Sequence, residues 1–303
     1  MITRLHHPAG SLAHDDDAVL LTADLAGWAY CGLLVLSLSP QVERSTVLDG
    51  CEGVVLPLSA TDVRVVVDGE AFLLRGRRSV FERVTDFVYA PLGSVVSVTA
   101  PSGGEVALAT ARCEVRFAAR YGAAEDVTVE TRGAGPATRQ VTNFLSPEVW
   151  PDAHRLMCVE LLTPDGNWSS YPPHRHDDSP DCPVNNEEIY YFRIGTAGST
   201  DYSVDGFGMH RTYTDPRADG TVEIDENVVI RDGDVFCVPR GYHGPCIAAP
   251  GYPMYYLNVL AGPGGERSMA FCDDPAHHWV RDSWAGMPTD PRVPMTTAAG
   301  ATT

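Results

Sequence analysis

One ten-residue pattern occurs twice in this 303-residue chain, and its two copies are 148 residues apart. The first copy, DFVYAPLGSV, runs from Asp86 to Val95, and the second, DVFCVPRGYH, runs from Asp234 to His243. Both consist of an acidic residue, four strand-type residues and a Pro-x-Gly turn. A repeat at about half the chain length indicates duplication of one domain. The fold should therefore contain two similar units, of which the second has a histidine where the first has a valine.

The apolar segments of the chain are short and are bounded by Gly, Pro, Asp or Asn. Val63–Val67, Ile189–Ile194 and Tyr255–Val259 are examples, and none continues with the 3.6-residue period of a helix. The 28 glycines and 23 prolines favour the tight turns that join such strands. We predict an all-β protein with two domains, residues 1–130 and residues 131–303. The small, polar tail from Met295 to Thr303 is expected to be disordered.

The charge of the chain excludes several classes of function. The net charge is −18, which argues against nucleic acid or an anionic membrane surface as a partner. All 22 basic residues are arginine, so neither a lysine Schiff base nor a P-loop lysine is present. The eight cysteines form no C-x-x-C pair, and no apolar segment is long enough to export the chain or span a membrane. We expect a cytoplasmic protein with free thiols.

Four residues of the second half have the chemistry of a metal site. His174 and His176 are two residues apart, so in an extended chain both imidazoles point to one face. Glu188 opens a strand after a loop, and the Pro-x-Gly turn of the repeat leads to His243. Three neutral imidazoles and one carboxylate suit a divalent metal such as Zn, Mn or Fe, with open positions for substrate oxygens. Glu187 is the rival carboxylate, but in a strand it faces away from Glu188.

These residues resemble the metal site of the cupin family. The first cupin motif has a His-x-His followed by Glu-x6-Gly, and here Gly195 follows Glu188 at that spacing. The second motif, Gly-x5-Pro-x-Gly-x-x-His, is matched by Gly233, Pro239 and Gly241. His243 comes one residue earlier than this motif requires, and the loop between His176 and Glu188 is longer than is usual in cupins.

Both departures are shared by a narrower family, 5-deoxy-glucuronate isomerase of inositol catabolism, which this chain resembles from Arg132 to Trp279. The similar segments are Asn167–Asp177, Glu188–Tyr191, Val238–His243 and Tyr255–Gly262. The resemblance implies a bicupin of two β-sandwich barrels, a degenerate one at residues 1–130 and a metal-binding catalytic one at residues 131–303. Such a protein would use a divalent metal to convert 5-deoxy-D-glucuronate into 5-dehydro-2-deoxy-D-gluconate. Its partner would be a small sugar acid, and assembly into a homo-oligomer is left open. A metal that chelates neighbouring carbonyl and hydroxyl oxygens would stabilise an enediolate, although an internal hydride shift is the alternative route.

The remaining site residues are assigned from strand phase. Tyr190 shares a strand face with Glu188, and Tyr256 shares one with Asn258, so we name the two tyrosines as catalytic candidates and Asn258 as a substrate-binding one. Arg211 is our candidate for the substrate carboxylate, because a planar guanidinium suits that group; Arg139 and Arg240 are its rivals.

Three alternative functions remain open. They are a ketol isomerase of another uronate, an Fe-dependent cupin dioxygenase, and a sugar-acid binding protein without catalytic activity.

Overall fold

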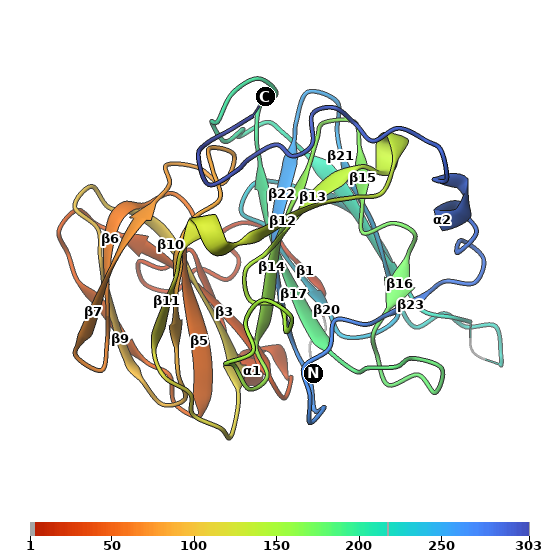
Figure 1. The fold of residues 1–303 in the computed structure, drawn as a ribbon. Helices are drawn as coiled ribbons and strands as arrows, with labels where there is room; N and C mark the ends of the chain where they lie inside the picture. The colour runs from red at the N-terminus through yellow and green to blue at the C-terminus, as the bar shows by residue number, and fades with distance from the viewer. Residues whose placement is uncertain (1–3, 217, 303) are drawn as a thin grey trace.

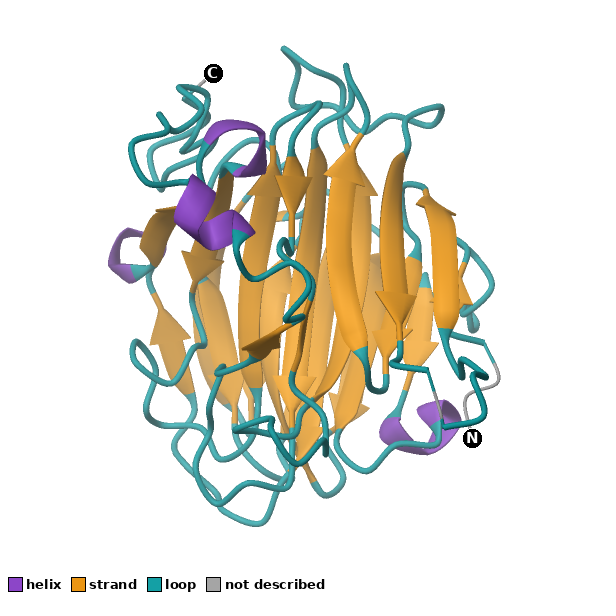
Figure 2. Ribbon diagram, turned by 90° about the vertical axis from the view of Figure 1, so that its right-hand side faces the viewer, coloured by secondary structure: helices purple, strands orange, loops and turns teal. Residues whose placement is uncertain are grey.

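The computed structural model describes residues 4–216 and 218–302, and it confirms the all-β class. Two β-sandwich units lie side by side, the first in red to yellow and the second mainly in green to blue (Figure 1). Each unit is built from two antiparallel sheets. The loops and short helices gather at the ends of the strands (Figure 2). No helix in the described ranges is long and apolar enough to cross a membrane.

The first unit combines a six-stranded and a four-stranded sheet. The larger sheet has the order β11-β8-β5-β10-β3-β2 and contains β2 (Val19–Leu21), β3 (Cys31–Leu38), β5 (Cys51–Pro57), β8 (Phe87–Ala90), β10 (Gly104–Arg112) and β11 (Arg120–Gly122). The smaller has the order β4-β9-β6-β7 and contains β4 (Arg44–Val47), β6 (Thr61–Val67), β7 (Glu70–Gly76) and β9 (Val95–Thr99). The helix α1 (Ala23–Ala26) joins β2 to β3.

The second unit places a seven-stranded sheet opposite a smaller one. The large sheet has the order β1-β20-β17-β22-β14-β13-β12 and contains β1 (His6–His7), β12 (Thr128–Arg132), β13 (Arg139–Asn143), β14 (Met157–Thr163), β17 (Glu187–Ile194), β20 (Val235–Val238) and β22 (Met254–Ala261). The opposite sheet, β19-β18-β21-β16-β23 with β15 on β21, contains β15 (Trp168–Ser169), β16 (His174–Arg175), β18 (Gly208–Tyr213), β19 (Asp225–Ile230), β21 (Tyr242–Ala248) and β23 (Cys272–Asp273). Short helices are η1 (Ala124–Asp126), η2 (Gly135–Ala137) and α2 (Val280–Ser283).

The border between the two units does not follow the order of the chain strictly. β1 comes from the N-terminus but pairs with β20 in the second unit, where His6 is opposite Phe236. β12 spans the predicted boundary at residue 130 and belongs to the second unit's large sheet. That boundary stays a prediction.

The repeated pattern has the same local structure in both copies. In each, a four-residue strand (β8 or β20) follows the acidic residue, which caps nearby backbone. Asp86 accepts from the N–H groups of Arg75 and Gly76, and Asp234 accepts from those of Ala9 and Arg231. The copies diverge at their last residue. Val95 is half-exposed at the start of β9, whereas His243 is fully buried in β21.

Apolar side chains fill three clusters, one inside each unit and one between them. The cluster between the units forms where the large sheets face each other, and it includes Leu33, Ala109 and Val259. Strands β14 and β22 are buried on both faces as a result, which explains why their sequences show no alternation of apolar and polar residues. The interior of the first unit is closely packed with aliphatic residues such as Val65 and Leu108.

Two glutamates hold the units together in a reciprocal way. Glu52 of β5 accepts from the backbone N–H groups of residues 154–156 in the second unit, at 2.6–2.8 Å. Glu187 of β17 accepts from those of residues 29–31 in the first unit, at 2.7–2.9 Å. Each carboxylate thus satisfies three backbone donors of the other unit, and hydrogen bonds to charged groups are the strong ones.

The C-terminal tail does not behave as its composition predicts. The Gln140 side-chain oxygen accepts from the N–H groups of Met295 and Thr296, at 2.8 and 3.0 Å, and Thr296 is buried. The N–H of Val84 in the first unit donates to the carbonyl of Thr297. The expectation of disorder is therefore wrong for these residues, because polar partners on both units satisfy their backbone; Thr303 lies outside the described residues.

Candidate metal centre

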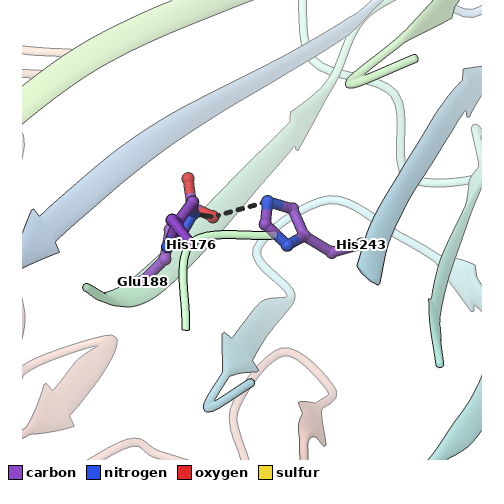
Figure 3. Close-up of side chains that lie close together, drawn as sticks. All are labelled: His176, Glu188 and His243. Atoms are coloured by element: carbon purple, nitrogen blue, oxygen red, sulfur yellow. Dashed lines mark hydrogen bonds and ion pairs between the residues drawn. The ribbon is translucent and has the colours of Figure 1, made fainter. Parts of the chain in front are cut away.

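His176, Glu188 and His243 converge inside the second unit (Figure 3). Glu188 is the second residue of β17, while His243 lies on β21 in the opposite sheet. His176 directly follows β16, whose first residue, His174, is the register partner of His243. A glycine at position 244 is required here, because a Cβ there would collide with the carbonyl oxygen of Ser170.

The ligand atoms of these three side chains lie within 4.8 Å of one another. The Glu188 Oε2 is 3.1 Å from Nε2 of His176 and 3.1 Å from Nε2 of His243. All three residues are buried, with exposed fractions of 6% or less. Two imidazoles and a carboxylate thus face one point inside the protein.

The hydrogen bonding of His243 fits a metal ligand. Among the described residues, neither ring nitrogen of this buried histidine has a hydrogen-bond partner. The 3.1 Å contact with Glu188 is an ion pair and does not have the geometry of a hydrogen bond. An unsatisfied buried nitrogen costs about 1–3 kcal/mol. Coordination of a cation by Nε2 would remove that cost, so the donor set fits a divalent metal.

His174 lies beside this group but outside the 4.8 Å limit. Its ring centroid is 4.4 Å from that of His243 and 6.4 Å from that of His176. Its Nδ1 is 3.2 Å from the carbonyl oxygen of Pro172, and Nδ1 of His176 is 3.1 Å from that of Asn186. Such backbone contacts orient metal-binding histidines and leave Nε2 available as the ligand atom.

The electrostatics keep the carboxylate charged and one imidazole neutral. Burial would raise the pKa of Glu188, but His243 and His176 outweigh it and lower this pKa well below the usual value. Burial, together with the nearby His243 and His176, lowers the pKa of His174 far enough to favour its neutral form. Burial opposes protonation of His176 as well, yet the hydrogen bond to Glu188 raises its pKa. A carboxylate and neutral imidazoles are the forms that bind metals.

A cavity of about 720 Å³ is lined by His174, His176 and Glu188, and its volume is within the usual size of small-molecule sites. One of its walls is a single face of the large sheet, because alternate residues of five strands line it. These are Thr128, Glu130 and Arg132 of β12, Arg139, Val141 and Asn143 of β13, Val159 and Leu161 of β14, Glu188 and Tyr190 of β17, and Asn258 and Leu260 of β22. Ser170, His174, His176 and the segment 268–271 belong to the rest of the lining.

The predicted catalytic and binding residues of β17 and β22 lie near the histidines. Asn258 donates from Nδ2 to Oε1 of Glu188 at 2.8 Å, and its Oδ1 has no partner among the described residues. The hydroxyls of Tyr190 and Tyr256 lie 3.4 and 3.0 Å from Oγ of Ser170, and of the two tyrosines only Tyr190 lines the cavity. Burial raises the pKa of both tyrosines well above the usual value, so their hydroxyls stay protonated. The bridging role of Ser170 had no signal in the sequence.

The three candidate arginines are placed differently. Arg211 is not among the residues that line the cavity; its Cζ lies 4.0 Å from the ring centroid of Tyr213, and Nη2 is 3.7 Å from Asp225. Arg240 is half-exposed and forms an ion pair with Glu223. Only Arg139 of the three lines the cavity.

Glu187, the rival carboxylate, points the other way. Because neighbouring residues of a strand face opposite sides, Glu187 reaches the first unit while Glu188 faces the cavity. The structure therefore shows what the sequence predicted, namely that Glu187 and Glu188 face opposite sides of the strand.

Comparison with known proteins identifies close relatives. Residues 5–280 match the KduI/IolB family. The 5-deoxy-glucuronate isomerase of Geobacillus kaustophilus is 39% identical over 287 residues, which cover 93% of this chain and 97% of that protein. The crystal structure of an IolB-like protein from Salmonella typhimurium has a TM-score of 0.80 at 30% identity, covering 92% of this chain and 99% of that one. An oxalate decarboxylase from Lactobacillus farciminis, with a TM-score of 0.60 at 12% identity and 88% coverage of both chains, shares the fold alone.

Proposed function

The chain belongs to the KduI/IolB family, and on this premise we propose that it is a 5-deoxy-glucuronate isomerase acting in inositol catabolism. The reaction interconverts an aldose and a ketose, with 5-dehydro-2-deoxy-D-gluconate as the product. The observation that carries the proposal is the similarity along nearly the whole chain to 5-deoxy-glucuronate isomerases, together with the buried His–Glu–His group, two members of which line a cavity of suitable size.

We include His174 as a fourth ligand, together with His176, Glu188 and His243. The metal would be divalent, with Zn, Mn and Fe as the candidates. When bound, such an ion supplies Lewis-acid stabilisation for charge that develops on two neighbouring substrate oxygens. Asn258 would keep Glu188 oriented through the hydrogen bond to Oε1, so that Oε2 faces the histidines.

The tyrosines are suited to donate rather than to accept a proton. Tyr190 lines the cavity and its hydroxyl stays protonated, so this hydroxyl is suited to donate a hydrogen bond to a substrate oxygen. Through Ser170, the hydroxyl of Tyr256 lies next in the same chain of polar groups. This arrangement supports Tyr190 as the group in contact with substrate and Tyr256 as a residue that positions it.

The experiment is an assay of purified protein, loaded separately with Zn²⁺, Mn²⁺ or Fe²⁺, on 5-deoxy-D-glucuronate and on other uronic acids. We expect NMR to identify 5-dehydro-2-deoxy-D-gluconate as the product, without consumption of oxygen. Turnover of another uronate alone would identify a different ketol isomerase. Oxygen uptake that depends on substrate and iron would identify a dioxygenase instead.

The location of the protein in the cell and its oligomeric state are further proposals. We propose that it works in the cytoplasm on this small sugar acid and that its copies form a homo-oligomer. Sedimentation analysis of the metal-loaded protein would give the mass of the particle, and a single-chain mass of 32.7 kDa would contradict the second proposal.

A further inference from the structure

Arg139, the first residue of β13, is a buried cation without an anionic partner. Its exposed fraction is 8%, and it lines the same cavity as His174 and His176. The guanidinium donates from Nη1 to the carbonyl oxygen of Ala137 at 3.2 Å. Its Nε has no hydrogen-bond partner, and no carboxylate within residues 4–216 and 218–302 lies at ion-pair distance from it. A buried charge is normally paired, because its removal from water is costly.

The other two arginines of the cavity are paired. Nε of Arg132 lies 2.8 Å from Glu130, and Arg281 holds both carboxylate oxygens of Asp273 at 2.5 and 2.6 Å. These two guanidiniums already have an anion, whereas the capacity of Arg139 for a carboxylate is unused. Arg132 and Arg281 are also more exposed to solvent than Arg139, so the most buried of the three cavity arginines is the one that lacks an anion.

The surrounding structure leaves room for the guanidinium. Gly133 has φ of +78°, and a Cβ at this position would lie 2.8 Å from Nη1 of Arg139. The Trp284 ring centroid is 5.9 Å from Cζ of Arg139. Burial lowers the pKa of Arg139 to about 10, with a further contribution from Arg132 and Arg281, so the side chain is still charged at neutral pH. The protein therefore maintains a cation here at an energetic cost.

We propose that Arg139 binds the carboxylate of the substrate and thereby selects uronic acids over neutral sugars. This inference rests on the proposed function for the identity of the substrate. In a six-carbon uronic acid the aldehyde and the carboxylate are at opposite ends of the molecule. The histidine group would hold the first end, while the planar fork of Arg139 would take two carboxylate oxygens at the second.

The test compares a charged and a neutral ligand on the metal-loaded protein. D-glucuronate and D-glucose differ at C6, where one has a carboxylate and the other a hydroxymethyl group. Titration calorimetry would measure both dissociation constants for the natural sequence, Arg139→Gln and Arg139→Lys. We expect the natural protein to prefer glucuronate and Arg139→Gln to weaken glucuronate binding by about 30-fold or more, while glucose binding changes little. The dissociation constant of Arg139→Lys for glucuronate should lie between those of the natural protein and Arg139→Gln, because lysine keeps the charge but lacks the planar pair of N–H donors.

Two further variants serve as controls. Arg132→Gln removes another cavity cation that is already paired, and Arg211→Gln removes one that lies outside the cavity; both should keep the preference for glucuronate. The inference would be overturned if the natural protein showed no preference for glucuronate, or if Arg139→Gln kept that preference. It would also be overturned if Arg211→Gln lost the preference. Circular dichroism would verify that every variant is folded.

Steady-state kinetics separate this inference from the proposed function. On 5-deoxy-D-glucuronate, Arg139→Gln should raise KM more than it lowers kcat, because the carboxylate is held in both ground and transition states. If the natural protein fails to turn over this compound, the proposed reaction is wrong. The calorimetric comparison would still decide whether Arg139 is a carboxylate site.

Discussion

Glu187 and Glu188 are neighbours in one strand, yet their loss should have different consequences. Glu187 accepts three backbone N–H groups of the first unit, through Oε1 from Ala29 and through Oε2 from Tyr30 and Cys31. In Glu187→Gln, the amide oxygen can replace Oε2, but the NH₂ group faces the N–H of Ala29. Hydrogen bonds to charged groups contribute about 1.5–3 kcal/mol each, compared with about 1 kcal/mol for neutral ones. With one bond lost (about 1.5–3 kcal/mol) and two weakened by about 0.5–2 kcal/mol each, the free energy of unfolding should fall by at least about 2.5 kcal/mol.

The assay measures two quantities on each of Glu187→Gln and Glu188→Gln. Urea unfolding of the metal-free protein gives stability, and elemental analysis after dialysis against metal gives stoichiometry. Glu187→Gln should be less stable but keep its metal. Glu188→Gln should lose the metal, because substitution of a residue that only orients a ligand already costs about 10–100-fold in affinity. Loss of metal from Glu187→Gln with retention in Glu188→Gln would reverse the ligand assignment, and a Glu187→Gln stability within about 0.5 kcal/mol of the natural protein would refute the proposed link between the units.

Four further results are expected. Asn258→Ala should weaken metal binding by about 10–100-fold in a competition titration with a chelator, because Glu188 loses the hydrogen bond that orients it; unchanged affinity would exclude that role. His174→Ala should lose turnover and bind metal more weakly while its circular dichroism stays that of the folded protein, since apolar cores and not an ion hold the barrels together; tight metal binding by the variant would remove His174 from the ligand set. Arg292 lowers the pKa of Asp290 to about 2, below the value of about 3.9 for a free carboxyl group. The stabilisation it provides is complete above that free value and is lost as pH falls through about 2, so acid unfolding of Asp290→Asn should depend less on pH between 4 and 2 than that of the natural protein. Product formed in D₂O should contain carbon-bound deuterium if the migrating hydrogen leaves as a proton, and NMR showing none would indicate an internal hydride shift.

The sequence was sufficient to predict the class of the fold and the group of residues around the site. The half-length repeat predicted two related units, and both copies form a four-residue strand followed by a Pro-x-Gly turn. The Glu-x6-Gly spacing selected Glu188 for the site, and the period of two in a strand placed Glu187 on the opposite face, because alternation depends only on local backbone geometry. Burial of the large sheets on both faces could not be read in the same way, since it depends on how the units pack.

Sequence reasoning preferred Arg211 to its rival Arg139, whereas Arg139 and not Arg211 lines the cavity. Arg211 was placed on a strand near the site, but its register with β21 shifts between His210 and Thr212, and these two residues point inward while Arg211 does not. Arg139 is far from the histidine motif in sequence, and it comes to line the same cavity through the order of strands in the large sheet.

The sequence alone determined which chemical groups this protein has and which side of a strand each takes, because both follow from residue type and an alternation of two. Only the tertiary structure decided which cation is left without a partner, which glutamate satisfies the backbone of the other unit and which polar tail is buried. Those outcomes depend on pairings between residues more than a hundred positions apart, such as Gln140 with Thr296. Burial makes an unpaired polar group costly, so it is the packing of distant segments that determines whether such a group has a structural partner or remains available for a ligand.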